Sequence, residues 1–242
     1  MKHVKYLAAV CFAAGMSFAV SSCNSGGEKK AEEKPADSST VTTPEPAAPV
    51  KPGNMLVITA KIANYAKWLP EYESHDSVRL ASGLHNYVIA RGVKDTNMVM
   101  VALKMDDAEK AKAFVANPDL KARMQKSGII GAPTISFLDV QFQDNSENTT
   151  STRVMVSHKV KDWDAWKKVF DEDKPNRTNA GFTDRLIAHE VGDNHKVSVV
   201  LLVSDMAKAE AFSKSPELKA KMEAGGVEGP PSFFYYTIAK KY

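Results

Sequence analysis

The sequence predicts an α+β protein made of two ferredoxin-like repeats that pack sheet to sheet. Three observations support this prediction. They are a gapless internal duplication, a β-α-β-β-α-β order of elements in each copy, and central strands that are apolar on nearly every residue. The duplication sets the number of repeats, the order of elements sets the fold of each repeat, and the apolar strands set how the repeats pack.

The second half of the chain repeats the first at an offset of 98 residues, so that residues 56–140 align with 154–238 without a gap. About 24 of these 85 positions are identical. We therefore expect repeat 1 at 54–142, a polar linker at 143–152 and repeat 2 at 153–242. Identical pairs include Trp68 with Trp166, Arg79 with Arg177, Gly83 with Gly181, Phe114 with Phe212, Pro118 with Pro216 and Gly131 with Gly229.

Each copy begins with a strand and a helix. Residues 56–61, and 154–159 in the second copy, are β-branched and apolar, which is typical of a strand. Asn64 and Asp162 are favourable N-cap residues for the helix that follows. One apolar face of that helix is predicted by the spacing of Tyr65, Trp68, Leu69 and Tyr72.

The rest of each copy predicts a hairpin, a broken second helical region and a last strand. In the first copy the hairpin strands are expected at 87–93 and 98–104, and in the second at 185–191 and 197–203. The second helical region opens at Asp107 and restarts at Asn117-Pro118-Asp119, because proline suits the first position of a helix. Last strands are expected at 134–140 and 232–238.

The central strands indicate how the copies pack. Residues 98–103 and 197–203 are apolar on nearly every residue, whereas a sheet with one wet face should alternate. Helices can cover only one face of a ferredoxin-like sheet. We therefore expect each copy to cover the other's free face, so that both enclose a shared core that can hold a cavity.

The N-terminus predicts export and lipid anchoring. Lys2 and Lys5 precede an apolar run over 7–20, which is too short for a comfortable membrane span. The run ends in Val20-Ser21-Ser22-Cys23, which resembles the lipobox of bacterial lipoproteins. We expect a signal peptide at 1–22 and lipidation at Cys23; the alternative is an ordinary signal peptide that leaves Cys23 as a free thiol.

A tether is expected at 23–53, counting the lipidated cysteine. This segment is rich in Glu, Lys, Pro, Ser and Thr and carries almost no large apolar residue, so it cannot bury enough surface to fold. Asn24, which is not an aspartate, favours the outer membrane of a Gram-negative cell by the same resemblance. The expected location is therefore the cell envelope, and the expected membrane contact is the lipid on Cys23.

Composition excludes several classes of function. The chain has 242 residues and a formal net charge of only +3, and its basic residues alternate with acidic ones, so no nucleic-acid partner is expected. The two cysteines, Cys11 and Cys23, both lie near the N-terminus. The folded part therefore has no disulfide framework and no thiolate zinc site.

One family resemblance follows from the repeat itself. The run Val160–Asp171, followed by Arg177 and Gly181, Phe212, Pro216-Glu217-Leu218 and Gly229-Pro230-Pro231, resembles the dimeric α/β-barrel superfamily. Within it, the closest resemblance is to antibiotic-biosynthesis-monooxygenase-like domains. Members of this superfamily normally pair as dimers to form the barrel. The resemblance therefore implies that the tandem copies complete one barrel within a single chain.

The resemblance also implies candidate activities. Some family members oxidise polycyclic aromatic substrates without metal or flavin, and related folds bind or degrade haem. A haem triad of Asn, Trp and His cannot be placed residue by residue on this sequence. We therefore expect no cofactor.

Two repeated pairs are candidate ligand-binding residues, and each has a structural alternative. Arg79 and Arg177, expected just after the first helix of each copy, could hold an anion at a cavity mouth or cap the helix C-terminus. Trp68 and Trp166 could stack on an aromatic ligand or belong to the core, since they lie on the apolar helix stripe.

Three histidines that differ between the copies are further candidates. His158 replaces Ala60 on a strand, His189 replaces Arg91, and His75 lies near the end of the first helix where the second copy has Asp173. His158 and His189 could share a sheet face and titrate or bind metal, or they could be satisfied by backbone partners. No carboxylate with suitable ligand spacing accompanies them, so we expect no metal site, and no catalytic residue is identified.

The main hypothesis is a non-enzymatic envelope lipoprotein that binds a small apolar or aromatic ligand, or a partner protein, in or on the barrel. The alternative is a cofactor-independent, monooxygenase-like enzyme acting on an aromatic substrate. A third hypothesis is haem binding, which predicts a Soret band on addition of hemin.

Overall fold

The computed structural model describes residues 53–242, which form eight strands and eight helices. The signal peptide at 1–22, Cys23 and all of the tether except Gly53 lie outside the described residues, so those predictions stay predictions. Among the described helices, none has the length and apolar character needed to span a bilayer.

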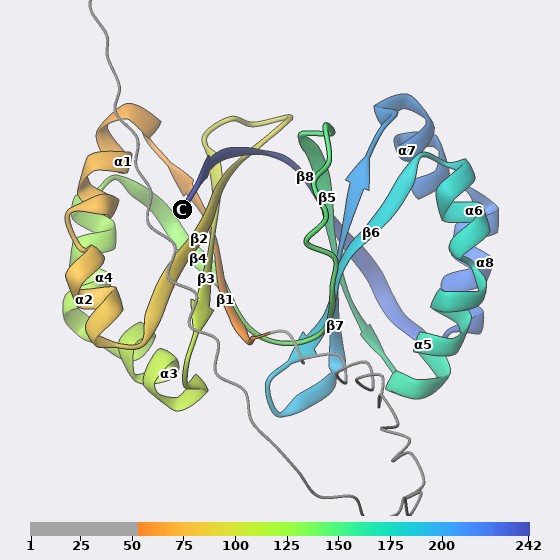
Figure 1. Ribbon diagram of the computed structural model, residues 1–242, viewed down its shortest axis with the longest axis horizontal. Coiled ribbons are helices and arrows are strands. Elements are labelled where there is room, and N and C mark those ends of the chain that lie inside the picture. The colour runs from red at the N-terminus through yellow and green to blue at the C-terminus, as the bar shows by residue number, and fades with distance from the viewer. Residues whose placement is uncertain (1–52) are drawn as a thin grey trace, which may run out of the picture. The chain divides into compact units, whose positions relative to one another are not determined.

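Each half has the β-α-β-β-α-β order, with both helical regions split in two (Figure 1). The first half consists of β1 (Met55–Ile62), α1 (Tyr65–Glu73), α2 (Asp76–Ala81), β2 (Leu84–Gly92), β3 (Met98–Met105), α3 (Ala108–Ala116), α4 (Pro118–Lys126) and β4 (Ile129–Gln143). The second half consists of β5 (Thr152–Val160), α5 (Trp163–Glu172), α6 (Lys174–Asn179), β6 (Phe182–Glu190), β7 (Asp193–Val203), α7 (Met206–Ser213), α8 (Pro216–Ala224) and β8 (Val227–Lys241).

The eight strands form a closed barrel in the order β1-β3-β2-β8-β5-β7-β6-β4. The two halves face each other across the barrel interior and are joined at both edges, by β2 to β8 and by β4 to β6. Helices of each half cover the outer face of its own sheet (Figure 1). The predicted fold class, two ferredoxin-like repeats forming an intramolecular α/β barrel, is confirmed.

The last strand of each half is longer than the sequence predicts. β4 runs over 15 residues, as does β8, whereas the strands were expected at 134–140 and 232–238. The extra length has a structural cause: β4 pairs with β1 up to Leu138, and from Leu138 to Gln143 it pairs with β6 of the other half. The additional residues at the C-terminal end of β4 therefore extend the joint between the halves, and those at its N-terminal end pair with β1.

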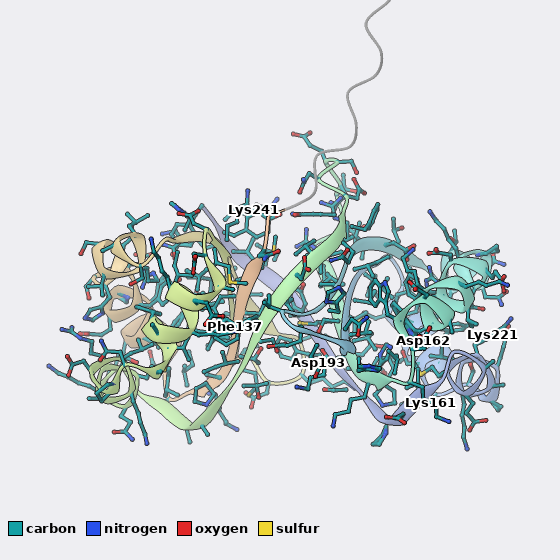
Figure 2. All side chains as sticks on the ribbon, turned by 90° about the horizontal axis from the view of Figure 1, so that it is seen from below. Phe137, Lys161, Asp162, Asp193, Lys221 and Lys241 are labelled. Atoms are coloured by element: carbon teal, nitrogen blue, oxygen red, sulfur yellow. The ribbon has the colours of Figure 1, made fainter. Side chains whose placement is uncertain are left out.

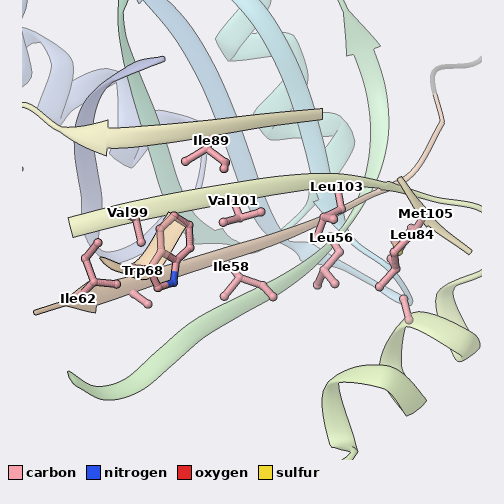
Figure 3. Close-up of a cluster of buried hydrophobic side chains, with 12 residues drawn as sticks. Leu56, Ile58, Ile62, Trp68, Leu84, Ile89, Val99, Val101, Leu103 and Met105 are labelled. Carbon is pink, nitrogen blue, oxygen red and sulfur yellow. The ribbon is translucent and has the colours of Figure 1, made fainter. Parts of the chain in front are cut away.

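Buried side chains form three layers. One lies between the sheet and helices of the first half (Figure 3), the second is its counterpart in the second half, and the third fills the barrel interior. The interior layer draws residues from both halves, among them Met55, Ala90, Ala188 and Tyr236. Strands β3 and β7 are therefore apolar on both faces because both faces are covered.

The first helix of each copy is interrupted, which the sequence analysis did not predict. α1 ends at Glu73 and α2 begins at Asp76, so Arg79 lies inside a short second helix. It is not in the loop that follows a single helix. The N-caps are as predicted: Asn64 accepts from the Lys67 amide at 3.0 Å and Asp162 from the Ala165 amide at 2.7 Å. Figure 2 labels Asp162 beside Lys161, where the chain enters α5.

Candidate functional site

The first half contains a cavity of about 510 Å³ between the outer face of its sheet and its helices. Its floor consists of apolar strand side chains, including Ile58, Ala60 and Val101. The aromatic side chains of Trp68, Tyr72 and Phe114 line it from the helices. This volume lies within the ~300–1,000 Å³ range of small-molecule sites. At roughly 30 Å³ per water, it equals about 17 water molecules, the size of a fused aromatic ring system.

The equivalent space in the second half is almost filled and measures about 70 Å³. Most of its lining residues are equivalent to residues that line the first-half cavity, with Val156 for Ile58, Trp166 for Trp68 and Phe212 for Phe114. The largest change in side-chain volume on the floor is at one position, where Ala60 is replaced by His158. An imidazole therefore occupies space that a methyl group leaves open in the first half.

His158 is buried among apolar groups. Its ring centroid lies 5.4 Å from that of Trp166, and neither ring nitrogen has a hydrogen-bond partner among the described residues. Burial lowers the pKa of His158 to about 4, so the ring is neutral at pH 7. A neutral ring without polar partners acts here as a space-filling group.

The polar side of the first-half cavity is a network around Arg79, which is only 4% exposed. Nη1 of Arg79 donates to the Tyr72 carbonyl oxygen at 2.7 Å, close to the C-terminus of α1, and Nη2 donates to Asp76 at 3.3 Å. The Tyr72 hydroxyl donates to Asn86 Oδ1 at 2.5 Å, and Asn86 in turn donates to Asp76 at 2.6 Å. Among residues 53–242, Arg79 forms an ion pair with Asp76 alone, whose side chain is 47% exposed.

The second half neutralises the equivalent arginine more completely. Arg177 donates from Nε and Nη2 to the two carboxylate oxygens of Asp184, at 3.2 and 3.0 Å. The Asp184 side chain is 12% exposed, and it stands where the first half has the neutral Asn86. Arg177 also donates from Nη1 to the Phe170 carbonyl oxygen, as Arg79 does to that of Tyr72. Both arginines thus make the helix C-terminal contact, and they differ in counter-charge.

His75 lies at the rim of the first-half cavity with both ring nitrogens engaged. Nδ1 donates to the Glu71 carbonyl oxygen at 2.7 Å, and Nε2 accepts from Arg123. His75 is the only histidine among the described residues that line this cavity, so no imidazole nitrogen is left there to bind iron. The residues present therefore do not fit haem.

His189 and His158 share the outer face of the second-half sheet, and each is paired in register with Val197. The ring centroid of His189 lies 4.9 Å from that of Trp163, and its Nε2 lies 4.0 Å from an Asp139 carboxylate oxygen. Over residues 53–242, no three His, Cys, Asp or Glu side chains gather as a metal site would require.

The seven candidate residues chosen from sequence all lie on the helix-covered faces, whereas the sequence analysis placed a cavity between the two sheets. Arg79, Trp68 and His75 line the first-half cavity, and Arg177, Trp166 and His158 line its filled counterpart. His189 lines neither of them. Sequence reasoning missed Tyr72, Asn86, Asp184 and Arg123 as site residues. Comparison of the non-identical positions of the repeat would have singled out Asn86 against Asp184.

A separate cavity of about 370 Å³ does lie in the barrel interior. It is lined by residues of both halves, including Val57 and Met100 of the first and Met155 and Val200 of the second. The structure therefore has one cavity where the sequence analysis expected it, and a larger one between a sheet and its helices.

No protein-family model and no curated protein sequence matches this chain. Solved structures do. An anthrone oxidase-like protein aligns with a TM-score of 0.54 at 13% identity, covering 78% of this chain and 92% of that chain. A candidate chlorite dismutase aligns with a TM-score of 0.51 at 13% identity, and the alignment covers 78% of this chain and 96% of that chain.

A ferredoxin-fold protein from Listeria monocytogenes, related to antibiotic biosynthesis monooxygenases, aligns with a TM-score of 0.44 at 7% identity, covering 78% of this chain and 96% of that one. At such low identity, structural similarity establishes the fold and nothing further. The protein therefore has the α/β-barrel fold that it shares with the anthrone oxidase-like protein and the candidate chlorite dismutase, with both halves of the barrel supplied by one chain.

Proposed function

We propose that this protein binds a small, mainly aromatic molecule in the cavity of its first half. The observation that carries the proposal is the contrast between two homologous spaces, one of about 510 Å³ and one of about 70 Å³. A packed interior rarely keeps voids larger than a water molecule. A space of this size, in a chain whose second copy shows how it can be filled, favours a ligand.

The lining supports the choice of an aromatic ligand. Trp68 and Tyr72 stack with ring centroids 5.1 Å apart, and both rings border the cavity. Flat aromatic molecules pack favourably against such rings. Arg79, with its weakly compensated charge, favours a ligand that carries a carboxylate or phenolate group.

The N-terminal sequence supports a place in the cell envelope for this binding protein. We propose export through the signal peptide at 1–22, lipidation of Cys23 and a tether at 23–53 that holds the barrel away from the outer membrane. Ligand binding would then occur outside the cytoplasm. Labelling of the native protein with a radioactive fatty acid, lost in Cys23→Ser, tests this anchor.

The same cavity also supports a second candidate, a cofactor-independent oxygenase acting on an aromatic substrate. The specific observation is the buried Arg79 guanidinium beside an aromatic cavity, which favours the phenolate form of a substrate over the phenol. The anthrone oxidase-like neighbour supplies the substrate class to test. Oxygen consumption with anthrone that is abolished in Arg79→Met would support this candidate. If the wild type consumes no oxygen, only the ligand-binding function remains.

The primary test is calorimetric titration of the full chain with 9-anthracenecarboxylate, whose size matches the cavity. We expect one binding site in the wild type. Affinity should fall at least 100-fold in Ala60→His, which introduces the side chain that fills the equivalent space of the second half. Ala60→Ser, which keeps the side chain small, is the matched control and should bind like the wild type. Native mass spectrometry of protein from its own host should also show a retained ligand.

The converse variant sharpens this test. His158→Ala should open the second half and raise the number of bound 9-anthracenecarboxylate molecules from one to two. If Ala60→His binds the probe as well as the wild type does, the proposed site is wrong.

A further inference from the structure

We propose that the barrel interior is a second ligand site, which binds a small amphipathic anion: one short apolar chain that ends in a carboxylate. This site does not share its lining with the first-half cavity, and it does not depend on the function proposed above. Three features of the interior support it: its size, its apolar wall and a pair of polar side chains without partners.

The interior cavity has the size and wall of a site for one short chain. Its volume of about 370 Å³ equals roughly 12 water molecules at ~30 Å³ each, close to the number of non-hydrogen atoms in a ten-carbon carboxylate. Its apolar lining includes Val57, Met100, Met155 and Val200. Methionine side chains adapt to flexible chains because they are unbranched and polarisable.

A polar pair enters this apolar space from neighbouring strands. Arg153 of β5 and Tyr236 of β8 are directly paired in register, and both line the interior cavity. Val154 packs in the outer layer of the second half, so alternation along β5 directs Arg153 to the inner face. Tyr236 belongs to the interior layer. The guanidinium and the phenol therefore project to the same side.

Neither group has a polar partner. Tyr236 is 3% exposed, and its hydroxyl forms no hydrogen bond with another described residue. The guanidinium of Arg153 likewise has no hydrogen bond or ion pair within 53–242. Burial raises the pKa of Tyr236 and Arg153 opposes that rise, so the phenol stays protonated at pH 7 and can donate. Both groups line the cavity as donors without a protein acceptor, and a carboxylate would accept from both.

The other charged side chains that line the interior cavity leave Arg153 free to bind an anionic ligand. Arg185 donates to Asp144 at 3.1 Å and to the Ser146 carbonyl oxygen at 2.9 Å, so its charge is already compensated. Lys241 and Glu147 also line the cavity. The lining thus has three cationic and two anionic side chains, which favours an anionic ligand.

The pair formed by Arg153 and Tyr236 has no polar equivalent in the first half. At the equivalent positions the first half has Met55 for Arg153 and Leu138 for Tyr236, and both are buried in the interior layer. At this pair of positions one wall of the interior therefore offers two donors, and its counterpart offers apolar side chains. This arrangement suits a molecule with one charged end and one apolar chain.

The test variants introduce at Arg153 and Tyr236 the residues found at the equivalent positions of the first half. Arg153→Met and Tyr236→Leu install the residues that the first half carries at the same positions, so both fit a barrel wall of this type. We expect decanoate to bind the full-length wild type with one site by calorimetry. The expected loss of affinity is at least 10-fold in Arg153→Met and about threefold in Tyr236→Leu. Decanol, which lacks the charge, should bind weakly and equally to wild type and Arg153→Met.

Ala60→His distinguishes this site from the first-half cavity. It should leave decanoate affinity unchanged, while it removes binding of 9-anthracenecarboxylate. Decanoate affinity that is unaffected by Arg153→Met, or that is lost in Ala60→His, would overturn the interior site. Absence of decanoate binding to the wild type would overturn it as well.

Discussion

The two helix-covered halves of this protein share a backbone plan and differ in what their interiors can hold. The floor of the first ends in the methyl group of Ala60 and leaves about 510 Å³ open, whereas the second carries His158 and leaves about 70 Å³. The first leaves Arg79 with a half-exposed counter-ion, whereas the second pairs Arg177 with Asp184, whose side chain is only 12% exposed. The contrast shows that a cavity in this fold depends on a few floor and rim residues and not on the path of the chain.

The largest expected effect concerns the paired tryptophans. Trp166→Ala should lower the free energy of unfolding by about 3–5 kcal/mol, because Trp166 packs in a filled layer. Trp68→Ala should cost about 1–2 kcal/mol less, since Trp68 already borders open space and loses fewer contacts. Urea unfolding followed by circular dichroism measures both. Equal losses would show that the first-half cavity is filled by neighbouring side chains in solution.

The next effect on stability concerns the groups that compensate the charges of Arg177 and Arg79. Asp184→Ala should cost about 3–5 kcal/mol, because it leaves the guanidinium of Arg177 buried without its carboxylate. Asn86→Ala, the matched change in the first half, removes neutral hydrogen bonds and should cost about 1–2 kcal/mol. The measurement is again urea unfolding at pH 7. If the two variants lose the same stability, the arginines are compensated equally.

A smaller effect is expected from His158, and it depends on pH. His158→Leu should raise the free energy of unfolding by about 1 kcal/mol at pH 7, because it removes two buried nitrogens without partners and keeps the volume. Burial lowers the pKa of His158 from 6.5 to about 4, so between these values the unfolded state binds the proton more readily. Wild-type stability should therefore fall as the pH drops from 6.5 to 4.

The Leu variant should lose that part of the pH dependence, which is on the order of 2–3 kcal/mol at pH 4. The measurement is the free energy of unfolding of both proteins across this pH range. Parallel curves for wild type and His158→Leu would show that the imidazole is hydrated and not buried.

The smallest expected effect concerns a feature that the two halves share, the side-chain cap at the start of α1 and of α5. Asn64→Ala and Asp162→Ala each remove one side-chain cap at the start of α1 or α5, and each should cost about 1 kcal/mol. Melting temperatures of the two variants should fall by the same few degrees. A large difference between them would mean that the helices of one half are held less firmly, so that the contrast extends beyond the floor and rim.

Much of the fold could be predicted from local chemistry. Asn64 and Asp162 cap helices as expected, and the apolar strands β3 and β7 are covered on both faces because the halves enclose each other. The break between α1 and α2 was missed, although Pro175 at the start of α6 in the second copy is a local signal for a new helix. The extension of β4 was missed because its partner, β6, belongs to the other copy.

The candidate site was predicted less completely. The exchange of Ala60 for His158 was visible in the aligned repeat, yet it was interpreted as a question of titration or metal binding. Its observed effect on cavity volume depends on packing distances that sequence spacing does not give. Asn86 against Asp184 was visible too, but only the structure shows that Asp184 pairs with Arg177, whereas Asn86 donates to Asp76, the carboxylate that Arg79 contacts.

The joined edges of the barrel, β2 with β8 and β4 with β6, have an evolutionary consequence. In a barrel assembled from two identical subunits, every mutation appears twice, so a histidine that closes one chamber closes both. Fusion into one polypeptide removes that constraint, since each copy can mutate alone while the hydrogen-bonded seams keep the partners together. Here the first copy holds an open cavity, the second is packed around His158, and Arg153 of the second copy faces the barrel interior without a charged equivalent in the first.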